Sequence, residues 1–237
     1  MDLSLLPTAG ELPSRALAAR WRPGLAGALH SEIFASSDEG SGAALAIALA
    51  LDTPGAADEQ RTVLWVQDRG AVRLAGRPYR PGLPAPLRRR VIHVFAATPE
   101  DALFALEEGV HCRDLACVIG EIAGNPKALD FTASRRLSLA AERHGVPLFL
   151  VRLDAARDLS AARMRWQVAA APSPPPRWNA AAPGAPAWRA ELFRARAHPP
   201  GEWILRDDGH VLAAEPAVPP DHGDLADAAG GRSLAAS

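Results

Sequence analysis

Short apolar runs alternate with amphipathic segments through the first two thirds of the chain. Consecutive apolar residues of this length are typical of strands that are buried on both faces of a parallel sheet. Strands separated by helix-length segments imply crossover connections between parallel neighbours. The runs that we predict as strands are Ile33–Ala35, Val63–Gln67, Val91–Phe95, Leu115–Ile119 and Val146–Val151.

The segments between these runs carry helix start and stop signals. Thr98 is placed to cap a helix that begins with Pro99 and two acids and runs to about Gly109. A second helix is predicted over Thr132–His144, with Gly145 as the residue that ends it. Ala-rich sequence after Gly42 and the stretch Ser14–Trp21 are two further predicted helices. The fold class that follows is α/β, a mostly parallel β-sheet with helices on both faces.

The pattern changes after residue 162. Met164, Trp166 and Val168 alternate with polar residues, which predicts an edge or antiparallel strand. Beyond Pro172 the chain is rich in proline and tryptophan, and its acidic end has six carboxylates and no Lys or Arg between Asp207 and Asp227. The division that we predict is an α/β domain over 14–171, a Pro/Trp-rich extension with short strands over 172–206, and a disordered tail over 207–237.

Charge and cysteine content narrow the classes of function. A formal charge of −1 provides no global basic field for nucleic acid. Cys112 and Cys117 lack the spacing of a disulfide framework or a metal pair, and the histidines show no ligand spacing. Nothing resembles a signal peptide or a membrane span, so we expect a cytoplasmic protein with no membrane association and no metal or other cofactor.

The turn after the first strand has the outline of a phosphate-binding loop but not its chemistry. Such a loop needs a lysine for the phosphates and a Ser or Thr for the metal, and the only lysine in the chain is Lys127. Two carboxylates in the turn would also repel a polyphosphate. We interpret the turn as a degenerate nucleotide loop, with an ordinary Gly/Ser turn before a buried helix as the alternative. Its residues are Ser37, Asp38, Glu39, Gly40, Ser41 and Gly42.

Several short motifs in order along the chain resemble the ImuA family of bacterial damage-induced mutagenesis. The resemblance spans about residues 14–206 and includes Ser31–Phe34, Val118–Glu121, Thr132–Glu142 and Pro174–Trp178. It implies a fold similar to that of RecA. It also implies action with ImuB, a Y-family polymerase homologue, with RecA as a further candidate partner and an error-prone C-family polymerase as an indirect one.

Comparison with RecA suggests that the catalytic parts are missing. Arg69 falls where RecA carries its water-activating glutamate, with Asp68 one residue away. Gly120 falls at the position of the Walker B aspartate, which leaves Glu121 as the nearest acid. Loss of several charge-stabilising groups removes orders of magnitude in rate, so the family resemblance favours a protein without ATPase activity.

Exposed arginines and tryptophans are the remaining candidates for binding. Large aromatic side chains in a thin extension predict either an interface or packing back onto the domain. The helix arginines and one loop arginine are candidates for DNA or partner contact, against the alternative of solvated surface charges. The partner-binding candidates are Trp178, Trp188, Trp203, Arg177, Arg194 and Arg196, and the candidates for DNA or partner contact are Arg135, Arg136 and Arg157.

Taken together, the sequence favours a non-catalytic adaptor of error-prone translesion synthesis in the SOS response. Two alternatives stay open. One is a division inhibitor of the SulA type that binds FtsZ, and the other is a nucleotide-hydrolysing RecA paralogue.

Overall fold

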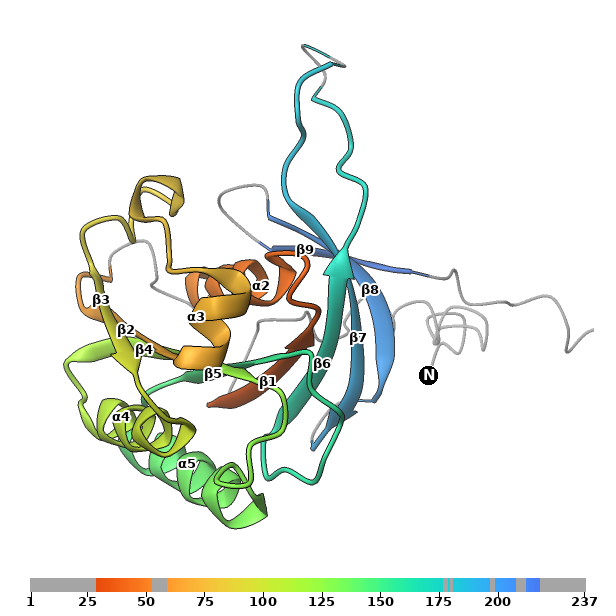
Figure 1. Ribbon diagram of the computed structural model, residues 1–237. Helices are drawn as coiled ribbons and strands as arrows, with labels where there is room; N and C mark the ends of the chain where they lie inside the picture. Colours follow the sequence, from red (N-terminus) through yellow and green to blue (C-terminus); the bar gives the residue numbers. More distant parts are fainter. Residues whose placement is uncertain are drawn as a thin grey trace, which may run out of the picture.

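The computed structural model describes residues 29–52, 59–176, 179, 181–196, 199–207 and 212–217 (Figure 1). The predicted helix Ser14–Trp21 lies outside these residues. The helices are α2 (Ser41–Leu51), α3 (Arg69–Ala75), η2 (a 3-10 turn, Arg80–Gly82), α4 (Pro99–His111) and α5 (Phe131–His144). The strands are β1 (His30–Ala35), β2 (Thr62–Asp68), β3 (Val91–Ala96), β4 (Leu115–Ala123), β5 (Leu148–Leu153), β6 (Met164–Ala170), β7 (Ala187–Ala195), β8 (Gly201–Asp207) and β9 (Leu212–Pro216).

All the described strands form one mixed sheet in the order β3-β2-β4-β5-β1-β6-β7-β8-β9. Neighbours from β3 to β6 run parallel, and β6 to β9 pair in antiparallel fashion. The predicted α/β class with a mostly parallel sheet is therefore confirmed. Within the described chain no helix is both long and apolar enough to cross a membrane.

The helix signals in the sequence act as predicted. The Thr98 side chain accepts a hydrogen bond from the Asp101 backbone N–H at 3.1 Å, and Pro99 occupies the first turn of α4. Gly145 ends α5 in the left-handed conformation, with φ 71°. Helix α3 was not predicted; its cap is Asp68, which accepts from the Ala71 N–H at 2.6 Å.

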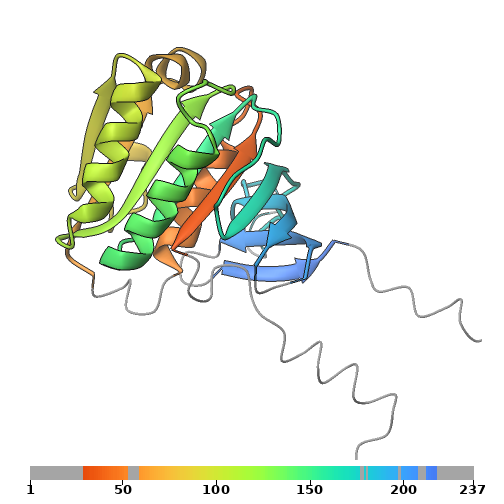
Figure 2. The same ribbon diagram turned by 90° about the horizontal axis from the view of Figure 1, so that it is seen from below.

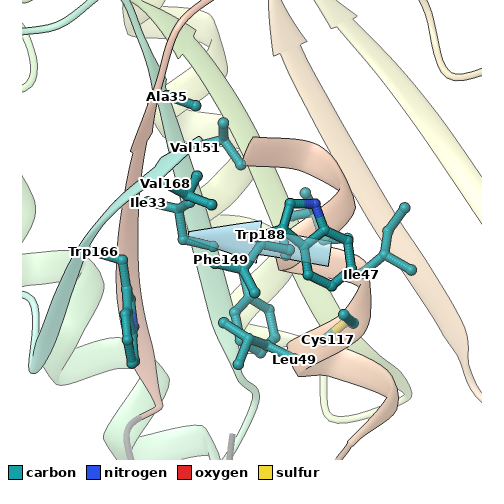
Figure 3. Packing of buried hydrophobic residues seen from close by; sticks show 14 of the residues in the cluster. Ile33, Ala35, Ile47, Leu49, Cys117, Phe149, Val151, Trp166, Val168 and Trp188 are labelled. Atoms are coloured by element: carbon teal, nitrogen blue, oxygen red, sulfur yellow. The ribbon is translucent and has the colours of Figure 1, made fainter. Parts of the chain in front are cut away.

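Two apolar layers cover the sheet. Helices α4 and α5 pack on one face with Leu106, Val118 and Leu150, and α2 packs on the other face (Figure 2). Trp188 from β7 lies in this second layer among Ile47 and Phe149 (Figure 3). Helices on both faces explain why the parallel strands carry apolar residues on both sides.

The C-terminal strands continue the sheet. The segment predicted as an edge or antiparallel strand is β6, which pairs antiparallel with β7; the antiparallel alternative is confirmed, and the edge alternative is wrong because β1 lies on its other side. β7 and β8 extend the same sheet beyond the boundary predicted at 171/172. β9 pairs with β8 within the tail predicted from residue 207, and residues 218–237 lie outside the described chain.

Candidate partner-binding site

The predicted nucleotide loop is held closed by carboxylates of the chain itself. Ser37 donates its backbone N–H to Asp154 Oδ1 at 2.9 Å and its hydroxyl to Oδ2 at 2.6 Å. These bonds lower the pKa of the exposed Asp154 carboxyl. Glu39 accepts from the Ser41 hydroxyl at 2.7 Å and from the Ala170 N–H at 2.9 Å. The Ser37 N–H and the hydroxyls of Ser37 and Ser41 are therefore already bound to acceptors of the chain itself.

Gly42 has a packing reason that does not involve a ligand. A Cβ at this position would lie 2.7 Å from a Val151 methyl carbon and 2.9 Å from the Ala35 Cβ. Only glycine lets the start of α2 approach β1 and β5 this closely. A Cβ on Gly40, by contrast, would meet nothing within 4 Å, and no side chain caps the helix there.

The acids at the ends of β2 and β4 also have structural roles. The indole N–H of Trp65 donates to Glu121 Oε1 at 2.6 Å. Burial of the carboxyl raises the pKa of Glu121 to about 7. Asp68 is occupied as the cap of α3. In the described part of the chain, no group of three or more His, Cys, Asp and Glu side chains is placed to hold a metal ion.

A buried ion cluster lies at the centre of the sheet. Glu32 on β1 has no exposed surface, and its carboxylate lies 2.7 Å from Arg165 Nε and 3.7 Å from an Arg152 nitrogen. Asp158 adds a second carboxylate at 3.3 Å from Arg152 and 3.6 Å from Arg165. Arg165 on β6 lies opposite Glu32 in the register, and Arg152 on β5 lies opposite Phe34, two residues further along β1. Because both arginines contact the Glu32 carboxylate, the cluster fixes three strands to one another. Spacing along the sequence gave no signal for it.

Hydroxyl groups connect this cluster to the molecular surface. Ser160 donates to Glu32 Oε1 at 2.8 Å and shares a hydrogen bond with Ser134 at 2.7 Å. Ser138 on the next turn of α5 lies 2.6 Å from His30 Nδ1. Complete burial, with nearby arginines, lowers the pKa of His30 to about 3. Ser138 and Ser160 thus form a polar floor that the buried network holds in place.

Above this floor is a cleft of about 510 Å3 between α5, the segment before β6 and the end of β7. We call it the arginine cleft. Its lining contains four arginines and no carboxylate, together with two hydroxyls and two exposed apolar side chains. The residues that define it are Phe131, Arg135, Ser138, Leu139, Ser160, Ala161, Ala162, Arg163, Arg194, Ala195 and Arg196.

The arginine cleft brings together candidates that the sequence had placed apart. Arg135 had been assigned to DNA or partner contact, and Arg194 and Arg196 to partner binding; all three line the cleft. None of the three forms an ion pair with a carboxylate of the described residues. Arg163, which was not predicted, pairs through Nε with Glu142 outside the lining. The cleft therefore keeps an excess of positive charge.

Two other candidate arginines are engaged elsewhere. Arg136 points to α4 and pairs with Glu107 at 2.8 Å. Arg157 pairs with Glu191 and lies over the Phe193 ring, 4.0 Å from its centroid. Neither residue lines the cleft.

The tryptophan candidates divide into two groups. Trp188 is buried in the core, and Trp203 packs against it with its ring 6.1 Å from that of Trp166. Both side chains pack onto the domain, and partner binding by either of them stays a prediction. Trp178 and its neighbour Arg177 lie outside the described residues.

Residues 171–176, 179 and 181–186 belong to the connection between β6 and β7 and project away from the sheet (Figure 1). We call it the proline arm. Its base is closed by the Ala171 N–H, which donates to the Ala187 carbonyl at 3.0 Å. Gly184 lies so close to Pro174 that a Cβ would come within 1.9 Å of the Pro174 carbonyl oxygen. The two sides of the arm therefore pack directly on each other.

No protein-family model matches the chain. The chain is similar to Protein ImuA from two strains of Caulobacter vibrioides, with 36% identity over 141 residues in each case. Each alignment covers 54% of this chain and 54% of the relative, so the match spans about half the length of these curated proteins. Homology to ImuA over about half the chain is thereby shown, and the resemblance predicted from the sequence is confirmed to that extent.

Proposed function

We propose that this chain is a non-catalytic accessory protein of an ImuA/ImuB-type mutagenesis system. The observation that carries the proposal is the 36% identity to Protein ImuA. The aligned half of the chain is long enough to encode several neighbouring elements of the fold, so the similarity is more than a shared motif.

The geometry of the loop supports a role without catalysis. A nucleotide loop supplies free N–H donors, a lysine and a metal-binding hydroxyl. Here the Ser37 N–H and hydroxyl are bound to Asp154, and the Ser41 hydroxyl is bound to Glu39. An enzyme of this type would have to break these contacts and still lack the lysine.

The protein acts through contacts with other proteins in this proposal. The proline arm binds an ImuB-like polymerase homologue, and RecA is a second candidate partner. An error-prone C-family polymerase is reached indirectly. Proline restricts the unfolded ensemble, so ordering such an arm on a partner costs less entropy than ordering a flexible chain. Trp178 supplies the aromatic anchor that interfaces favour.

Two separate surfaces are available for these partners. The arm enters β7 at Ala187, whereas the arginine cleft lies at the other end of β7 beyond Phe193. At about 3.4 Å per residue, the strand separates them by roughly 27 Å. One partner on the arm therefore leaves the cleft open to another ligand.

The test is affinity for the ImuB homologue of the same genome, measured by calorimetry with the full chain. Trp178→Ala should weaken binding about 30-fold, which corresponds to the loss of about 2 kcal/mol typical of an aromatic anchor. Tyr79→Ala is the matched control, because Tyr79 is an aromatic residue 74% exposed on a different loop. Equal affinity of the Trp178 variant and the native chain would remove the arm from the proposal, and no binding by the native chain would refute the partner.

A further inference from the structure

We propose that the arginine cleft is occupied in the free protein by the chain's own acidic segment, residues 221–227. The inference rests on the proposed function only in treating the cleft as a partner surface. It adds a regulatory step, in which a partner must displace this segment. Three observations lead to it: the charge of the cleft, the composition of the segment and the place where the chain leaves the sheet.

The cleft has unbalanced charge. Of its four arginines, Arg163 is paired with Glu142, which leaves Arg135, Arg194 and Arg196 without an ion pair among the described carboxylates. Phe131 and Leu139 add apolar surface at the same site, with 47% and 51% of their surface exposed. A ligand that fits must be acidic and must also carry an apolar side chain.

The segment Asp221-His222-Gly223-Asp224-Leu225-Ala226-Asp227 has this composition. It supplies three carboxylates for three arginines, and Leu225 lies between the second and third of them. The parts of the chain outside the described residues offer no equal competitor. Residues 1–28 contain two acids and three arginines and are therefore basic, and residues 53–58 contain a single acid, Asp58.

The register of the sheet brings this segment within reach. Ala190 on β7 pairs with Trp203, and Trp203 pairs with Pro216 on β9. Two strand spacings place Pro216 about 10 Å from Ala190, and Arg194 lies about 13 Å further along β7. Because β7 and β9 are both antiparallel to β8, they run the same way, and the chain leaves β9 towards the end of the sheet that carries the cleft.

The length of the connection is sufficient. Residues 221–227 follow Pro216 by five to eleven positions, which spans about 17 to 36 Å when extended. The estimated distance to the cleft is on the order of 20 Å along the sheet surface. A tethered segment of this reach is present at an effective concentration in the millimolar range, so a weak ion-paired contact is enough to fill the cleft.

The test uses full-length protein and a labelled peptide of residues 218–231, with binding followed by fluorescence anisotropy at 50 mM salt. The native chain should bind the peptide at least about 10-fold more weakly than the variant Asp221→Asn/Asp224→Asn/Asp227→Asn, because its own segment competes. Adding Arg135→Gln and Arg194→Gln to this variant should abolish its higher affinity for the peptide. Arg136→Gln, on the same helix but paired with Glu107, is the matched control and should leave it unchanged.

Several results would overturn the inference. Equal peptide affinity for the native chain and the triple variant would show that no internal segment competes. Peptide binding that survives Arg135→Gln/Arg194→Gln would place it outside the cleft. A 20-nucleotide single strand that binds the triple variant through these arginines, while the peptide does not, would make the cleft a nucleic-acid site. None of these assays contains a polymerase homologue, so their failure is distinct from failure of the proposed function.

Discussion

Removal of the Glu32 carboxylate is the strongest test of how the sheet is held together. Glu32→Ala deletes the buried acid between Arg165 and Arg152 and leaves Asp158, 34% exposed, as the one acid that the structure places in ion-pair contact with both arginines. Breaking a buried ion pair from one side typically costs about 3–5 kcal/mol, because the remaining charge is buried without compensation. The Ser160 hydroxyl also loses its acceptor. We expect a loss at the upper part of this range.

The assay is urea unfolding followed by far-UV circular dichroism. With a slope of about 2 kcal/mol per molar urea, a loss of 4 kcal/mol lowers the midpoint by about 2 M at an unchanged slope. Arg136→Ala is the matched control, because its pair with Glu107 is exposed and should contribute less than about 1 kcal/mol.

The double variant Glu32→Met/Arg165→Met separates a charge effect from a packing effect. If charge imbalance causes the loss, the double variant should lose less stability than the sum of the losses in Glu32→Met and Arg165→Met, by at least about 2 kcal/mol. A Glu32→Ala variant within 1 kcal/mol of the native chain would refute the reasoning, because two buried arginines would then share the single, partly exposed Asp158 carboxylate at almost no cost in stability.

Further predictions concern the loop, the core and one titrating acid. Millimolar ATP with Mg2+ should leave the melting temperature of the native chain and of the Ser41→Lys variant unchanged. A ligand that binds at a hundred times its Kd would instead add about 2.7 kcal/mol to the free energy of unfolding. Trp188→Ala should cost about 3–5 kcal/mol in urea unfolding, and a loss below 1 kcal/mol would show that the residue is not core. The pKa of Glu121 is raised from 4.5 to about 7. Its contribution to the free energy of unfolding is therefore full below pH 4.5 and is lost as pH rises through 7. Relative to Glu121→Gln, the native chain should therefore lose about 3 kcal/mol between pH 4 and pH 8; the lowered pKa of His30 acts in the opposite direction below pH 6.5 but cancels in this difference. A stability difference between the native chain and Glu121→Gln that does not change with pH would contradict this prediction.

Local signals in the sequence were sufficient for most elements of the parallel half, with helix α3 as an exception. The cap at Thr98 and the left-handed Gly145 depend on neighbouring residues only, so they are visible without the fold. The apolar run predicts a strand that ends at Ile119, with Gly120 and Glu121 in the following turn, whereas β4 continues to Ala123. Burial of both residues between neighbouring strands overrides their low strand preference.

Contacts between distant residues could not be predicted in this way. Ser160 and Glu32 are 128 positions apart, and the arginine cleft combines residues of α5 with the end of β7. The sequence predicts single arginines as candidates, but their grouping depends on the strand order β1-β6-β7, which no local pattern contains. Trp188 was left between two alternatives for the same reason, since burial of a side chain in a late strand depends on where that strand pairs.

The central position of β1 also has a consequence for synthesis of the chain on the ribosome. β1 is the first described strand to be made, yet its two neighbours in the sheet are β5 and β6. Glu32 and Arg165 are separated by 133 residues. At a translation rate of about 5–20 residues per second, the nascent strand waits roughly 7–27 s for this partner. During that interval Glu32 places a charge directly before the apolar residues Ile33, Phe34 and Ala35, which protects the strand from pairing with another nascent chain. The Glu32 carboxylate therefore has two roles: it links the strands of the folded sheet, and before folding it opposes pairing between nascent chains.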